Sequence, residues 1–196
     1  IILIILPLCG CWDRREIGDL PIVMGFGVDK AKTPDKILIT SQIANPSASS
    51  TSKDGKSGSS SSPFITISEE GDYVFPSVRK SALVAGKKLY ISHNQVVIFG
   101  EDIAKEGISN YMDWFVRDHE LRLEMYVLVA DGTAKDILET PTDFEEVPAI
   151  HMTDLIKAQE DTSTGIVTDV LDFLDSFSSE RRSTVAPIIK VEDKML

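Results

Sequence analysis

The chain has 196 residues, of which 42% are hydrophobic and 26% are charged, values that are typical of a globular protein and unlike those of a disordered one. A total of 20 lysines and arginines stands against 31 aspartates and glutamates, so the formal net charge is −11. This balance argues against a nucleic-acid partner, because binding a polyanion requires a basic face.

The amino terminus is apolar, and charge begins abruptly at Asp13. An apolar run this short cannot span about 30 Å of hydrocarbon, which takes about 20 residues, but it suits the apolar core of a secretory signal. Because the chain begins with Ile rather than Met and lacks a basic leader, we expect the natural start to lie upstream. The alternatives are a truncated transmembrane helix and a buried amino-terminal strand.

Residues 8 to 11, Leu-Cys-Gly-Cys, look like a lipobox, the site at which bacterial lipoproteins are acylated and cut. Gly10 supplies the small residue before the cut, so we expect Cys11 to carry lipid and Cys9 to leave with residues 1–10. Each buried CH₂ of an acyl chain contributes about 0.8 kcal/mol, and two or more chains anchor a protein stably. The mature chain then has no free thiol, which fits an extracytoplasmic protein without disulfides.

Strand patterns open the folded part. Residues 21–29 are largely apolar with two glycines, which indicate a bend or a close backbone approach. Residues 36–44 predict a second strand, joined to the first as a hairpin. The serine-rich segment 47–62 has no large apolar side chain to offset the entropy of ordering, so we expect a flexible loop. Strand patterning resumes at 64–68, which we expect to pair with the strand before the loop.

Helix and strand patterns then alternate up to residue 140. A helix is expected to open at Pro76 and end at Gly86, with one apolar side formed by Val78, Ala82, Leu83 and Ala85. Asp102 and Thr133 are expected to cap two further helices, and the predicted strands between the helices are 89–100 and 123–130. Such alternation predicts an α/β fold, a mixed β-sheet with packed helices.

Beyond residue 140 the sequence predicts helices at 150–160 and 166–178 and a strand at 184–192. The second helix has an apolar stripe that needs a partner surface: Val167, Val170, Leu171, Leu174 and Phe177. We therefore expect residues 21–144 to form an amino-terminal α/β domain. Residues 145–196 would begin a second α/β domain that is cut short at Leu196.

Residue types that catalyse reactions or bind metals are present, but in no recognised arrangement. The histidines His93, His119 and His151 are scattered and match no metal-ligand spacing. We expect His93 to be a structural residue on a strand and His119 to lie at a charged bend. There is no glycine-rich phosphate loop, no GxSxG motif and no cysteine after residue 11. We therefore predict no catalytic residue, no metal and no cofactor.

Four segments, in family order, resemble the Ger(x)C family, the lipoprotein C subunits of GerA-type germinant receptors in endospore-forming bacteria. They are CGCWDRREIGDLPIV at 9–23 leading to GFGVDK, ISHNQVVIFGEDIAKEGI at 91–108, DWFVRDHELR at 113–122 and VLVADGTAKDIL at 127–138. The resemblance covers most of the folded chain. It implies a non-enzymatic, multidomain α/β lipoprotein of which this chain is the amino-terminal half.

The resemblance also implies a location on the outer face of the spore's inner membrane. There the protein would assemble with two membrane-embedded partners, the A and B subunits, to convert nutrient sensing into germination. A tether formed by residues 11–20 would raise the effective concentration, so weak contacts would suffice for assembly. The alternative is a lipid-anchored protein that captures a small molecule or peptide in a cleft between two domains.

Candidate interface residues follow from this interpretation. The amphipathic ring of Trp12 suits a membrane surface, and the charged turn after it would orient the domain. Exposed groups at 93–95 and 114–122 would offer further contacts. The candidates outside the 114–122 segment are Trp12, Asp13, Arg14, Arg15, Glu16, His93, Asn94 and Gln95.

Overall fold

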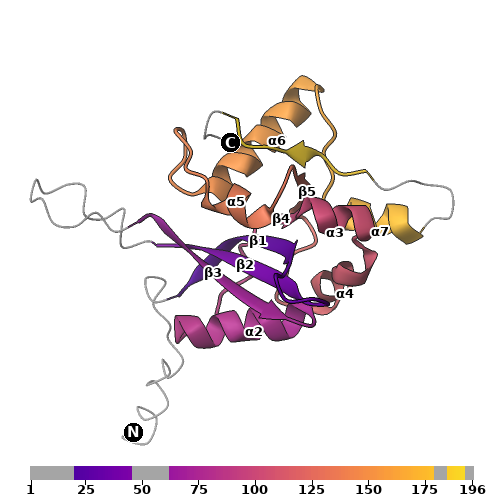
Figure 1. The fold of residues 1–196 in the computed structure, drawn as a ribbon. Coiled ribbons are helices and arrows are strands. Elements are labelled where there is room, and N and C mark those ends of the chain that lie inside the picture. Colours follow the sequence, from indigo (N-terminus) through magenta and orange to yellow (C-terminus); the bar gives the residue numbers. More distant parts are fainter. Residues whose placement is uncertain (1–19, 46–61, 179–184, 193–196) are drawn as a thin grey trace, which may run out of the picture.

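The computed structural model describes residues 20–45, 62–178 and 185–192 (Figure 1). These residues form a six-stranded sheet in the order β3-β2-β1-β4-β5-β6, with helices packed on it. The predicted class, a mixed β-sheet with packed helices, is confirmed. The signal remnant, the tether up to residue 19 and serine-rich residues 47–61 lie outside the described residues.

Three antiparallel strands form one half of the sheet: β1 (Ile22–Lys30), β2 (Ile37–Ala44) and β3 (Phe64–Gly71). The first two form the predicted hairpin, and β3 pairs with β2 as expected. A bulge shifts the register between Val23 and Gly25. Beyond the bulge, β1 turns Phe26 and Val28 toward one core and Gly25 and Gly27 toward the helices of the opposite face.

The other half of the sheet is parallel and consists of β4 (Val96–Phe99), β5 (Tyr126–Ala130) and β6 (Ile188–Ile189). All of β4 is buried: Val97 and Phe99 face one core, and Val96 and Ile98 face the other. This confirms that the strand is covered on both faces. The predicted strand at 89–100 shrinks to four residues, so the placement of His93 on a strand is wrong; His93 lies in the preceding turn.

Four helices contribute to the first core: α2 (Val74–Ala85), α3 (Glu101–Glu106), α4 (Ser109–Arg117) and α7 (Val170–Ser178). Phe26 from β1 lies among their aromatic side chains. Its ring meets those of Trp114 and Phe115 edge-on, with centroids 5.3 and 6.4 Å away. Edge-to-face contacts of this kind add to the stabilisation that burial of the rings provides.

Helix α2 buries only part of the side that was predicted: Val78 is buried and Ala82 and Ala85 pack against the first core. It begins at Val74, before Pro76, and ends at Gly86, whose left-handed backbone (φ 64°) suits glycine. Leu83, expected on the apolar side, is 81% exposed. The residues that α2 buries are Val74, Ser77, Val78 and Ser81. They follow the i, i+3, i+4, i+7 spacing of one helical face, from which Leu83 is excluded.

The second core lies under α5 (Ala134–Glu139) and α6 (Pro148–Thr162). Helix α5 packs close to β1 because the strand carries glycine there: a Cβ on Gly27 would lie 3.1 Å from both Ala134 Cβ and Leu138 Cδ1. The close approach predicted for the glycines is therefore confirmed. Thr133 caps α5 through a bond from the Asp136 amide at 3.1 Å, as expected.

The expected cap of α3 is wrong. Gly100 occupies the N-cap position without a side-chain cap, and Asp102 lies inside the first turn of the helix. A carboxylate there still interacts favourably with the positive end of the helix dipole.

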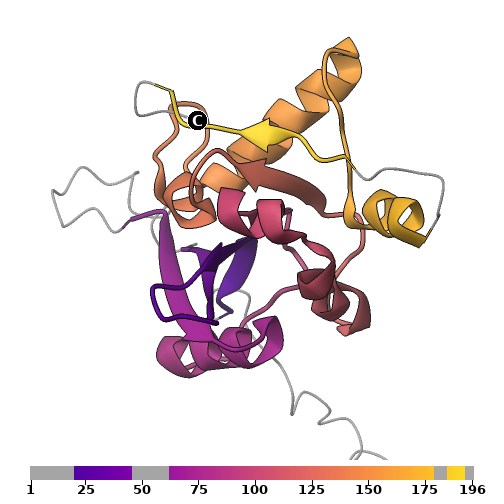
Figure 2. The same cartoon turned by 45° about the vertical axis from the view of Figure 1, so that its right-hand side comes forward.

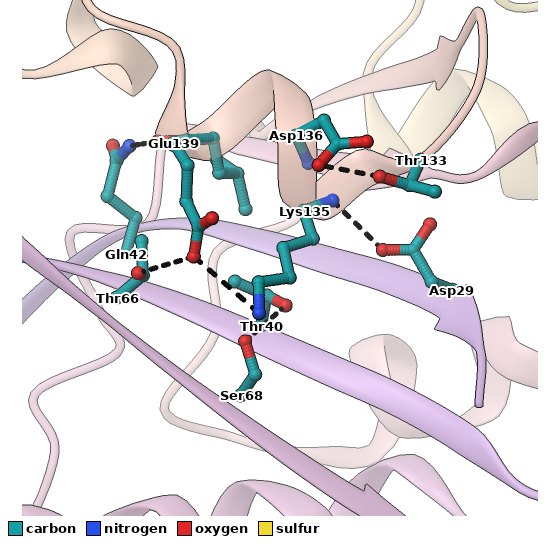
Figure 3. A network of polar contacts seen from close by, with 10 residues as sticks. Asp29, Thr40, Gln42, Thr66, Ser68, Thr133, Lys135, Asp136 and Glu139 are labelled. Carbon is teal, nitrogen blue, oxygen red and sulfur yellow. Dashed lines mark hydrogen bonds and ion pairs between the residues drawn. The ribbon is translucent and has the colours of Figure 1, made fainter. Parts of the chain in front are cut away.

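The side chain of Gln42 joins β2 to both helices of this face, and Figure 3 shows its bond to the end of α5. It is completely buried; its Nε2 donates to the Leu138 carbonyl at 2.6 Å and its Oε1 accepts from the Ala149 amide at 3.0 Å. The carbonyl lies near the end of α5 and the amide lies at the start of α6. Gln42 therefore satisfies a backbone group at each helix end that has no partner inside its own helix.

Residues beyond 145 continue the same sheet and cores. Ala149 and Met152 of α6 pack with β4 in the second core, and β6 pairs with β5. The helix predicted from residue 166 begins at Val170, which is buried in the first core. The sheet thus gives no support to a domain division near residue 145, which stays a prediction.

Replacing Gln42 with alanine is expected to lower the free energy of unfolding by about 2 to 4 kcal/mol, because it leaves a buried carbonyl and a buried amide without partners. Urea denaturation followed by circular dichroism measures the loss. Thr66→Val is the matched control on the neighbouring strand, since it removes only an exposed bond to Glu139 and should change stability by less than about 0.5 kcal/mol. Equal effects of the two substitutions would contradict the role given to Gln42.

Candidate functional site

The carboxyl ends of parallel strands are where open α/β sheets commonly bind ligands, and here Asp29 lies at that edge (Figure 3). The residue is near the end of β1 and is 4% exposed. Its Oδ1 accepts from the Ala134 amide at 2.7 Å, and its Oδ2 accepts from the Lys135 amide at 2.9 Å. The amides at the start of α5 therefore bind a carboxylate of the chain itself, in the way that helix N-termini elsewhere bind anionic ligands.

The backbone closes tightly around this carboxylate. A Cβ on Gly100 would lie 2.2 Å from Asp29 Oδ1, so any larger residue after β4 would displace the carboxylate from its present position. Burial raises the pKa of Asp29 above its ordinary value of 3.8, and the bonds from Ala134 and Lys135 oppose the rise only in part. The arrangement is that of a buried helix cap.

A groove of about 770 Å³ lies between α2 and α4 on the side of the first core. Its wall is largely apolar and comes from α2, from α4 and from the segment between α2 and β4. The apolar lining residues are Phe75, Val78, Ala82, Leu83, Leu89, Ile91 and Trp114. The predicted contact segment 114–122 contributes the opposite rim, so the structure brings part of that segment to a concave surface.

Charged groups along the rim pair with one another. Arg117 Nε donates to Asp113 Oδ1 at 2.7 Å. Lys88, in the segment between α2 and β4, pairs with Glu120, in the turn after α4. The Trp114 indole donates to Asp118 Oδ2 at 3.2 Å. A site for a small polar molecule usually has polar groups that converge on its interior. This rim instead frames an apolar surface.

The predicted residues His93, Asn94 and Gln95 lie together at a second hollow of about 240 Å³, beside Arg122 and Lys157. His93 is exposed and Gln95 is half-buried. Asn94 is only 6% exposed; its Nδ2 donates to the Val96 carbonyl at 3.1 Å, and its Oδ1 has no hydrogen-bond partner among the described residues. The expectation that Asn94 is an exposed contact is therefore wrong, because the turn before β4 directs its side chain inward.

Of the other candidate residues, those that the structure describes do not come together in one site. Residues 11–16, which include Cys11, precede the first described residue, Leu20. His119 lies at the groove in the turn after α4, as expected, and His151 is buried in α6 with its ring stacked on Phe144. Within the ranges that the structure describes, no group of three or more His, Cys, Asp or Glu side chains could hold a metal ion.

The sequence patterns did not predict the α2 wall of the groove. Of the four apolar residues assigned to one side of the helix, Val78 is buried and Ala82 and Ala85 pack against the first core, whereas Leu83 is exposed. The buried stripe also includes two serines. Ser77 and Ser81 turn their hydroxyls back to helix carbonyls, which lets small polar residues occupy a buried face. If serine is allowed at buried positions, Val74, Ser77, Val78 and Ser81 form one helical stripe, and Leu83 then falls on the exposed side of α2.

Comparison with known proteins gives one family. The model described as the spore germination protein N-terminal domain matches residues 13–191. Among curated proteins of Bacillus subtilis (strain 168), spore germination protein KC is 28% identical over 190 residues, which cover 96% of this chain and 46% of the relative. Spore germination protein A3 is 29% identical over 180 residues, or 88% of this chain and 47% of the relative.

A third relative, spore germination protein YndF of the same organism, is 31% identical over 174 residues, covering 78% of this chain and 43% of the relative. The chain spans less than half the length of the curated relatives it matches. No solved structure matches it significantly. Of the helices that the structure describes, none is both long enough and apolar enough to cross a bilayer.

The raised pKa of Asp29 predicts a pH dependence of stability. The folded protein holds this proton more tightly than the unfolded chain, so the free energy of unfolding should fall as the pH rises from about 3.8 toward the raised value. Asp29→Asn does not titrate and should remove this fall. Chemical denaturation between pH 3.5 and 7 measures the profile.

The control for this test is Thr133→Ala, which removes the neighbouring cap without removing a titrating group. This substitution should lower the free energy of unfolding by about 1 kcal/mol at every pH and leave the shape of its pH dependence unchanged. If wild type and Asp29→Asn gave parallel profiles, the raised pKa would be refuted.

Proposed function

Because the chain belongs to the spore germination protein C-subunit family and covers roughly its amino-terminal half, we propose that it is part of a lipoprotein subunit of a spore germinant receptor. The family match over residues 13–191 carries this proposal. The family is not known for enzymes, and we propose that this protein has no catalytic residues and acts by assembly.

The anchor of the proposed subunit is lipid on Cys11, at the outer face of the spore's inner membrane. Residues 8–11 supply the lipobox, with Gly10 before the cut. Nine further residues lead to Leu20, where the described fold begins. A fully extended segment of that length reaches at most about 30 Å, because each residue spans roughly 3.3 to 3.6 Å. The folded part would therefore stay close to the bilayer.

The proposed partners are the membrane-embedded A and B subunits. A tethered protein searches a surface at high effective concentration, so a modest contact area suffices for association. The groove between α2 and α4 supports this role, because its wall is apolar and Arg117 and Lys88 on its rim pair with Asp113 and Glu120. An apolar surface framed by paired charges is better suited to assembly than to binding a small polar molecule.

Capture of a small molecule or peptide is a second candidate, and the volume of the groove favours it. About 770 Å³ lies within the range of small-molecule sites. Trp114 lines the groove, so its fluorescence reports on occupancy once Trp12 is replaced with phenylalanine. A saturable change in that fluorescence on adding a candidate germinant would favour capture over assembly.

Mass spectrometry of protein purified from membranes tests the anchor. We expect a mature chain that begins with acylated Cys11, because Gly10 and Leu8 mark this cysteine. Cys11→Ala should lack both the lipid mass and the cut, and much less of it should be retained in the membrane fraction. Cys9→Ala, the matched control, should be acylated and retained like the wild type.

Two results would contradict the anchor. One is a mature amino terminus that carries no lipid or that begins at another residue. The other is unchanged retention of the Cys11→Ala protein in membranes, which would mean that something other than this lipid holds it there.

A further inference from the structure

Helix α2 and the residue before it expose several large apolar side chains. Tyr73, just before the helix, is 73% exposed; Phe75, Leu83 and Val84 are 46, 81 and 64% exposed. A single exposed apolar residue is common on protein surfaces. Several along one helix indicate a surface that meets a partner or a membrane.

The same stretch is basic in an otherwise acidic protein. Residues 73–92 contain no aspartate or glutamate, whereas the chain as a whole has a net charge of −11. The basic residues of this stretch are Arg79, Lys80, Lys87 and Lys88. We call the exposed residues Tyr73, Phe75, Leu83 and Val84, together with these four, the basic apolar face.

Some neighbouring groups already contact these cations. Lys80 donates to the Glu70 carbonyl at 2.9 Å, and Lys88 pairs with Glu120. The Arg79 guanidinium lies 5.1 Å from the centre of the Phe75 ring. Across the groove, Asp113 is paired with Arg117. Lys88 therefore has a carboxylate partner, and Lys87 also has an interaction partner. Arg79 and Lys80 instead meet an aromatic ring and a backbone oxygen, which do not neutralise their charge.

The position of α2 relates this face to the start of the fold. In both views α2 forms the bottom of the molecule, at the end opposite α6 (Figures 1 and 2). The Tyr90 amide donates to the Pro21 carbonyl at 2.9 Å, and the Val23 amide donates to the Tyr90 carbonyl at 2.9 Å. The segment that leads back toward Cys11 is therefore held two residues from Lys88.

We propose that the basic apolar face lies against an anionic lipid bilayer. This inference rests on the proposed lipid anchor, which brings the face within reach of the membrane. The exposed apolar side chains enter the interfacial region, as those of surface-bound amphipathic helices do. Each lysine or arginine near an anionic surface adds about fivefold to binding. The acidic remainder of the protein is repelled, so the charge distribution also fixes the orientation.

A protein partner for the same face is the competing occupant. The charge pattern and the fixed chain start favour lipid, because both the anionic head groups and the acylated cysteine belong to the same bilayer. Vesicles that contain this protein and lipid but no other protein distinguish a bilayer from a partner protein as the occupant of this face.

The experiment uses the full-length lipidated protein, purified and reconstituted into vesicles of phosphatidylglycerol and phosphatidylcholine. Leu83→Cys carries an environment-sensitive fluorophore on the basic apolar face. Ile188→Cys is the matched control, since Ile188 is 72% exposed on β6, away from α2. Acylation consumes Cys11 and processing removes Cys9, so within residues 11–196 each introduced cysteine is the single free thiol. Nitroxide-labelled lipids quench a fluorophore that lies at the bilayer.

We expect several-fold stronger quenching at residue 83 than at residue 188, and weaker quenching at 83 when phosphatidylcholine replaces the anionic lipid. If the protein sediments with the vesicles but the fluorophores at residues 83 and 188 are quenched equally, the proposal that the basic apolar face lies against the bilayer is refuted. The proposed lipid anchor would stand. Failure to sediment would instead overturn the proposed anchor. Protection of residue 83 only after germination proteins are added would assign the face to a protein partner and refute the lipid proposal.

Discussion

Two buried polar side chains of the hairpin hold α5 against the sheet, and the second layer of helices depends on them. Asp29 binds amides at the start of α5, and Gln42 binds the Leu138 carbonyl near its end (Figure 3). A helix of six residues has little stability of its own, because its first turn is costly to form. Gln42 Oε1 also accepts a hydrogen bond from the Ala149 amide, so the same side chain fixes the start of α6.

This use of Asp29 has a consequence for function. The sheet edge at which related architectures bind nucleotides or phosphates here holds a carboxylate from the chain itself, packed against Gly100. The surfaces left for interaction are on the helices, chiefly the groove between α2 and α4 and the basic apolar face beside it. A protein that acts by assembly at a membrane needs such surfaces more than it needs a cleft.

The sequence predicted the layered fold well, because strand periodicity, glycine positions and the Thr133 cap act locally. It could not predict which polar residues would be buried. Nothing in the strand pattern distinguishes Gln42 from a surface residue, since its partners Leu138 and Ala149 lie 96 and 107 residues away along the chain. The inward turn of Asn94 before β4 likewise left no signal in the sequence pattern. The serines of α2 misled in the same way: their hydroxyls bond within the helix, so the buried stripe included them and Leu83 was left outside.

The second layer of helices requires α5 to be held by the sheet rather than by its own helical bonds. Native-state hydrogen exchange at the amides of Ala134, Lys135 and Ala149 tests this most directly, since each donates to a side chain of the hairpin. We expect the three amides to exchange only when the whole domain unfolds, with free energies near the global value. Exchange through a local opening well below that value, while the amides of β4 stay protected, would contradict it.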